Sequence, residues 1–218
     1  MPMNNKRQLL QLSILALTLA FIILTYYISV NPIPSFDLQI SLFVQKYHSD
    51  VLDKIMLAIS LFGELPYSLV MVFIVAMTFH RYKYLRESYF ILSILSSGLL
   101  ILLIKNIIDR PRPTEFYVRL VEINRFQSYP SGHVLSYILF FGFMIVLMRQ
   151  LKDLSPATRN IISYISVFFM TTIAFSRVYL GAHWFSDTLG GFILGLICLL
   201  SLRYFYLKPL LKEPGKKQ

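Results

Sequence analysis

The chain has 218 residues, of which 56% are hydrophobic, and its mean hydropathy is +0.62. This composition excludes an ordinary soluble domain, and the recurrence of apolar runs along the sequence predicts one integral membrane domain over residues 1–218. The single cysteine, Cys198, lies inside an apolar run, which excludes an internal disulfide or a thiolate cluster. The formal charge of +10 is typical of nucleic-acid binding in a soluble protein, but its distribution here favours a membrane.

Six apolar runs predict an all-α, polytopic protein with six transmembrane helices. The first run, residues 9–30, carries no charge and is long enough for a bilayer, which takes about 20 residues. No small-residue cleavage site follows it, so we expect it to be retained rather than removed as a signal peptide. The other runs are shorter, and we expect each helix to continue past its charged end residues. They cover residues 65–79, 88–104, 132–148, 160–176 and 188–202.

The segment between the first two runs, residues 31–64, has a different pattern. Pro32 and Pro34 end the first helix. Apolar residues then recur at helical spacing, with charged residues between them: Phe36, Ile40, Phe43, Val44 and Tyr47. This predicts an amphipathic helix between transmembrane helices 1 and 2, either lying on the membrane surface or packed over the outer end of the bundle.

The basic residues predict the orientation. With the N-terminus placed inside, the inner segments hold thirteen of the basic residues and three of the acidic ones, and the outer segments hold eight of each. The whole net charge therefore falls on one side, as the positive-inside rule expects. We expect a multi-pass protein of the cell membrane with both termini in the cytoplasm and with both long polar loops outside.

Two polar motifs of this outer face suit an anion. In KNIIDRPRP, residues 105–113, the cations Lys105, Arg110 and Arg112 repel one another unless an anion joins them. In PSGH, residues 130–133, Ser131 and Gly132 begin a helix whose free N–H groups bind anions, and His133 follows in the first turn.

The third motif, SRVYLGAHWFSD at residues 176–187, adds the groups for covalent chemistry. If the helix includes His183, then Asp187 lies four residues on along the same face. A carboxylate there holds one imidazole nitrogen and leaves the other free as a nucleophile or base. Arg177 adds a planar fork for phosphate oxygens. Because no HxxxH pattern or carboxylate cluster accompanies these residues, we expect fixed cations in place of a metal, and no cofactor.

The three motifs, K-x6-RP, PSGH and SR-x5-H-x3-D, resemble those of the type 2 phosphatidic acid phosphatase superfamily, which also includes the vanadium-dependent haloperoxidases. The resemblance implies that His183 is the nucleophile, that Asp187 orients it and that His133 protonates the leaving group. Arg110 falls outside the matched positions, and its role stays open. The implied phosphate ligands are Lys105, Arg112, Ser131, the Gly132 N–H and Arg177.

The expected function is metal-independent dephosphorylation of a membrane lipid phosphate or diphosphate at the outer leaflet, through a phosphohistidine. The partners are a lipid substrate and the bilayer, with no nucleic acid. Undecaprenyl diphosphate, phosphatidylglycerophosphate and phosphatidic acid are the family's candidate substrates, and a lipid A phosphatase is a further possibility. The motifs do not separate them, because they contact only the phosphate. The alternative is a non-catalytic lipid-phosphate-binding or transport protein; a soluble vanadate-dependent peroxidase is disfavoured by the six apolar runs.

Overall fold

The structure, a computed structural model, describes residues 3–124 and 126–208. In this part of the chain the regular elements are helices and there is no strand, as the sequence predicts. In chain order they are α1 (Met3–Val30), α2 (Ser35–Gln45), α3 (Asp50–Ser60), η1 (Leu61–Gly63), α4 (Leu65–Arg81), α5 (Leu85–Ser93), η2 (Ile94–Ser96), α6 (Ser97–Ile108), α7 (Gly132–Gln150), α8 (Pro156–Tyr179) and α9 (Phe185–Leu207).

All six predicted apolar runs are helical. Five spans are long and apolar enough to cross a membrane: α1 from Arg7, the joined helices α5 to α6, α7, α8 and α9. The sixth run is α4, which has 17 residues and meets α3 and η1 at a bend of 59°; counting that bent pair as one span gives six. As expected, α6 and α8 continue past Lys105 and Arg177.

The centre of the bundle is α7, which packs against both α8 and α9. It is apolar around its circumference, and residues on every side of it are buried, among them Leu135, Ile138 and Leu147. A helix of this kind belongs in an interior. The peripheral helix α1 has the opposite pattern, because its leucines and isoleucines are largely exposed along its length, as a lipid-facing helix requires.

Glycines bring α9 close to α7 near the site. A Cβ at Gly191 would lie 2.5 Å from the Ser131 carbonyl oxygen, and one at Gly190 would lie 2.4 Å from the Tyr129 ring. Small residues allow such approach between membrane helices. The start of α7, which carries the PSGH motif, is thereby fixed against the start of α9, where the backbone N–H of Ser131 also donates to the carbonyl of Asp187.

The structure divides the segment between α1 and α4 into two helices, because the chain turns at residues 46–49 before Ser49 caps α3. The helix α2 packs over the ends of α8 and α9 with a buried polar face. That face consists of Asp37, Ser41 and Gln45, and Gln45 donates to the carbonyls of Arg119 and Tyr179. Its apolar face, including Leu42 and Phe43, is exposed. The helix thus covers the bundle end and presents apolar side chains outward.

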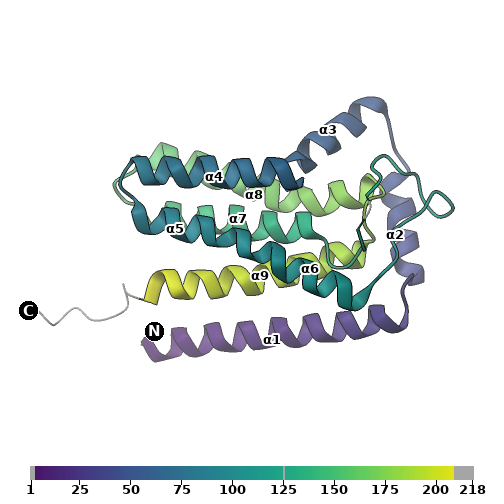
Figure 1. Cartoon of the computed structure of the whole chain (residues 1–218), viewed down its shortest axis with the longest axis horizontal. Helices are drawn as coiled ribbons and strands as arrows, with labels where there is room; N and C mark the ends of the chain where they lie inside the picture. The colour runs from purple at the N-terminus through teal and green to yellow at the C-terminus, as the bar shows by residue number, and fades with distance from the viewer. Residues whose placement is uncertain (1–2, 125, 209–218) are drawn as a thin grey trace, which may run out of the picture.

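The two ends of the bundle carry different segments of the chain. In Figure 1, α1 begins and α9 ends at the same end of the bundle. The helices α2 and α3 lie at the opposite end, with the connection from α6 to α7 and the connection from α8 to α9. The three sequence motifs therefore share that end.

Candidate active site

The three motifs converge on His183. Lys105 comes from the last turn of α6, His133 from the first turn of α7 and Arg177 from the last turn of α8. His183 itself lies in the short connection between α8 and α9 and is only 2% exposed. The sequence prediction that these residues meet at one end of the bundle is confirmed.

The expected reason for the pairing of His183 with Asp187 is wrong in one respect. The helix α9 begins at Phe185, so His183 precedes it and the two residues do not share a helical face. Asp187 instead occupies the third position of α9 and accepts a 2.9 Å hydrogen bond from the backbone N–H of Trp184, the N-cap residue. This cap fixes the carboxylate, whose Oδ2 lies 3.4 Å from His183 Nδ1. Nδ1 has no hydrogen bond of good geometry, and such contacts often tighten only when substrate binds.

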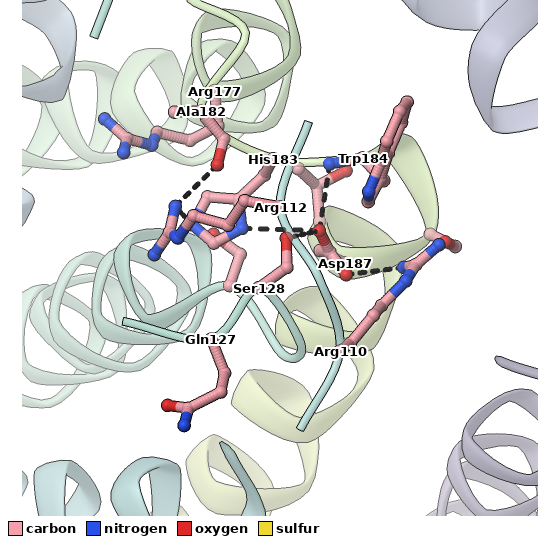
Figure 2. Close-up of polar contacts among 12 residues, drawn as sticks. Arg110, Arg112, Gln127, Ser128, Arg177, Ala182, His183, Trp184 and Asp187 are labelled. Atoms are coloured by element: carbon pink, nitrogen blue, oxygen red, sulfur yellow. Dashed lines mark hydrogen bonds and ion pairs between the residues drawn. The ribbon is translucent and has the colours of Figure 1, made fainter. Parts of the chain in front are cut away.

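Asp187 is held by a buried network that includes Arg110, the residue left open above (Figure 2). Arg110 Nη1 donates to Asp187 Oδ1 at 2.5 Å, and Nη2 donates to Asp37 Oδ2 of α2 at 2.7 Å. The hydroxyl of Ser128 also donates to Asp187 Oδ2. The side chains of Arg110, Asp37 and Asp187 are at most 1% exposed. Arg110 therefore holds Asp187 in place and ties α2 to α9.

The surroundings of His183 favour its neutral form. Burial lowers its pKa well below the usual 6.5, and the charges of Arg112, Arg177 and Lys105 lower it further. Arg112 Nη1 lies 3.4 Å from Nε2. With Asp187 on the Nδ1 side, we assign the tautomer that leaves a lone pair on Nε2 beside a cation. This is the state that a histidine nucleophile needs.

Lys105 and Arg112 are anchored by carbonyl groups. Lys105 Nζ donates to the carbonyls of Gln127 and Ser128, and Arg112 donates to those of Phe126 and Ala182. Burial and the nearby charge of Arg177 lower the pKa of Arg112 to about 10, so it stays charged at neutral pH. The structure gives neither residue a carboxylate partner among the described side chains, which leaves two positive charges uncompensated beside His183.

The PSGH motif begins α7 as predicted. Ser131 is the N-cap, and its hydroxyl accepts from the N–H of Val134 at 3.5 Å. A Cβ at Gly132 would make only ordinary contact with Ile101, so packing does not demand this glycine. Packing does demand Gly63, since a Cβ there would lie 2.1 Å from the His133 ring. The next residue, Glu64, reaches His133 Nε2 with Oε1 at 3.1 Å.

Arg177 is engaged by a carboxylate that the sequence analysis did not consider. Its Nη1 and Nη2 donate to the two oxygens of Glu122, each at 2.7 Å, and Nη1 also donates to the Ser60 hydroxyl. The Arg177 side chain is fully buried. Although burial opposes ionisation, the bonds from Arg177 lower the pKa of Glu122 to about 2.

Three side chains in this region bear atoms of the kind that bind metal ions. Glu64, Glu122 and His133 each offer one ligand atom, and these atoms lie within 4.8 Å of one another. Their chemistry fits a cation poorly, because both Glu122 oxygens already accept from the Arg177 guanidinium and Oε1 also accepts from Asn124. A metal here would also stand beside the buried positive charge of Arg177.

The sequence reasoning missed four residues of this site: Asp37, Glu64, Glu122 and Ser128. Each meets its partner across 55 or more positions of the chain. A signal existed for Asp37 alone, because Asp37, Ser41 and Gln45 form a polar stripe at i, i+4 and i+8. Such a stripe on an otherwise apolar helix indicates a polar partner.

The comparisons with known proteins give the family of the chain. Residues 86–209 match the PAP2 superfamily, and the chain belongs to this family. It is 29% identical over 192 residues to phosphatidylglycerophosphatase B of Bacillus subtilis (strain 168), covering 87% of this chain and 93% of that protein.

Two solved structures share the fold. The first is a transmembrane PAP2-type phosphatidylglycerolphosphate phosphatase from Bacillus subtilis, with a TM-score of 0.81, 24% identity and coverage of 93% of this chain and 99% of that chain. The second is LpxE of Aquifex aeolicus, with a TM-score of 0.60, 22% identity and coverage of 80% and 96%. The chain is thus a multi-pass membrane enzyme, a lipid phosphatase that removes phosphate from a membrane lipid.

Proposed function

We propose that the enzyme hydrolyses its lipid phosphate at the outer leaflet, without a metal, through a phosphohistidine on His183. The observation that carries the proposal is the state of His183: a buried, neutral imidazole with Asp187 at Nδ1 and the cation of Arg112 beside Nε2. Attack by Nε2 on phosphorus forms the N–P bond and breaks the P–O bond to the lipid. The lipid oxygen keeps the electron pair and takes a proton from His133. Water then attacks phosphorus and releases phosphate.

The phosphate contacts follow from the cations and N–H groups around His183. Lys105 and Arg112 supply two uncompensated positive charges, and the start of α7 at Ser131 and Gly132 supplies backbone N–H groups. Arg177 joins them by exchanging one of its two hydrogen bonds to Glu122 for a bond to a phosphate oxygen. These fixed donors offset the charge of the equatorial oxygens in the transition state, which is the role that a metal has in other phosphatases.

The relative's name supports a substrate class. The similar Bacillus subtilis protein is named phosphatidylglycerophosphatase B, so phosphatidylglycerophosphate is the first substrate to test. The charge distribution, with the net +10 on the side of the termini, supports an active site outside the cytoplasm. A site at the bundle end, beside the exposed apolar face of α2, suits a head group whose tails remain in the bilayer.

The test uses purified protein in detergent with phosphatidylglycerophosphate, phosphatidic acid and a soluble phosphate ester. We expect phosphate release from a lipid substrate that survives EDTA, and inhibition by orthovanadate, because a trigonal-bipyramidal anion resembles the transition state. Activity that EDTA abolishes and magnesium restores would contradict the fixed-cation mechanism. No release from any lipid phosphate would contradict the substrate class.

A further inference from the structure

Two carboxylates, those of Glu64 and Glu122, lie beside His133. Glu64 comes from the turn before α4, and Glu122 comes from the loop between α6 and α7. An oxygen of each lies within 4.8 Å of the other and of His133's ligand nitrogen. In the mechanism proposed above, His133 protonates the leaving group, so these carboxylates lie where the leaving group departs.

Both carboxylates are held in place. Glu122 is fixed by the fork of Arg177 and by Asn124, and its backbone N–H donates to the carbonyl of Leu180. Glu64 follows Gly63, whose backbone contacts the His133 ring so closely that no side chain fits there. Glu122 is therefore the more firmly held, whereas the Glu64 side chain is 42% exposed and is held by its contact with His133 Nε2.

The cations around the site differ in whether a carboxylate is already paired with them. Among the described residues, Arg110 is paired with Asp37 and Asp187, and Arg177 is paired with Glu122. The cations without a carboxylate partner are Lys105 and Arg112, which match the two negative charges of a phosphomonoester. A diphosphate carries additional negative charge, and the further charged side chains beside His133 are the carboxylates Glu64 and Glu122.

We propose that Glu64 and Glu122 make the site selective for phosphomonoesters over diphosphates; this rests on the proposed function. When a monoester reacts, the P–O bond breaks, phosphorus is transferred to His183 Nε2, and the oxygen that takes the proton from His133 becomes an uncharged hydroxyl group. When the terminal phosphate of a diphosphate is transferred, the departing oxygen belongs to a phosphate that remains charged. Charges of like sign repel one another in a partly buried site more strongly than they do in water. The carboxylates therefore oppose the diphosphate in both binding and reaction.

The test uses two substrates with the same tail, farnesyl phosphate and farnesyl diphosphate, and measures the first phosphate released. We expect kcat/KM of the wild type to be at least tenfold higher for the monophosphate. Glu64→Gln and Glu122→Gln should each lower this preference about tenfold, since each removes one charge and keeps the shape. Glu115→Gln, an exposed carboxylate of the same loop, is the matched control and should leave the preference unchanged.

The preference is a ratio measured on one preparation, so partial unfolding of a variant does not alter it. A wild type that favours the diphosphate, or Gln variants with an unchanged ratio, would overturn the inference while leaving the proposed function intact. A wild type inactive on both substrates, and on the lipids above, would instead count against the proposed function. A further outcome is a wild type that prefers the diphosphate only when magnesium is present, with this preference lost in Glu64→Gln. That result would show that the carboxylates bind a cation, and it would also overturn the inference.

Discussion

Arg110 offers the sharpest test of how the site is held together. Its guanidinium is the only described cation in contact with both Asp37 and Asp187, and all three side chains are at most 1% exposed. Arg110→Ala leaves two buried carboxylates without a cation and removes donors from Ser186 and the Pro32 carbonyl. Removing one partner of a buried ion pair costs about 3–5 kcal/mol. Because Arg110 pairs with two carboxylates, we expect Arg110→Ala to lower the free energy of unfolding by about 5 kcal/mol.

The assay is the midpoint of thermal unfolding in detergent. At roughly 2–4 °C per kcal/mol for a chain of this size, the midpoint should fall by about 10–20 °C. The matched control is Arg119→Ala, because Arg119 pairs with Asp53 but is 35% exposed, and such pairs contribute about 1 kcal/mol or less. A double-mutant cycle of Arg110→Ala with Asp37→Asn should show coupling between the two residues. Equal small shifts for Arg110→Ala and Arg119→Ala, with no coupling, would refute the reasoning.

The remaining predictions concern the chemistry and the orientation. Asp187→Asn should lower kcat less than His183→Ala does, because it removes orientation rather than the nucleophile; equal losses in folded protein would contradict these roles. Since burial and then Arg112 lower the pKa of His183, the acid limb of the kcat/KM profile should lie below pH 6.5, with activity lost as pH falls through the lowered pKa and the imidazole gains its proton; a limb above 6.5 would contradict the buried, neutral assignment. In a Cys198→Ala background, an impermeant thiol reagent on intact cells should label Phe116→Cys and spare Lys152→Cys, and the reverse pattern would invert the topology.

The elements that the sequence predicts well are those set by local composition. Apolar runs long enough for a bilayer become helices because the backbone must satisfy its hydrogen bonds internally, so the six runs and the shared end of the motifs follow directly. The break of segment 31–64 into α2 and α3 was less evident, since a surface helix has no fixed length. The buried polar face of α2, which consists of Asp37, Ser41 and Gln45, could be predicted from the spacing of these residues alone.

The partners of the motif residues were not predictable in this way. Glu122 meets Arg177 across 55 positions, and Glu64 meets His133 across 69. Nothing in the local pattern distinguishes these glutamates from other loop carboxylates, because their proximity depends on how α4, α7 and α8 pack. The motifs indicate which residues carry the chemistry, while the packing decides which of their charges are compensated. That compensation is the basis of the selectivity proposed above.

The most direct test of the central claim is to trap the phosphorylated enzyme. The wild type is mixed with a lipid substrate carrying a radiolabelled phosphate and quenched in alkaline detergent, conditions under which phosphohistidine persists. We expect label on the protein, mapped to His183 by mass spectrometry, lost on brief acid treatment and absent from His183→Ala. Label on another residue, or phosphate release by His183→Ala at the wild-type rate, would contradict the account.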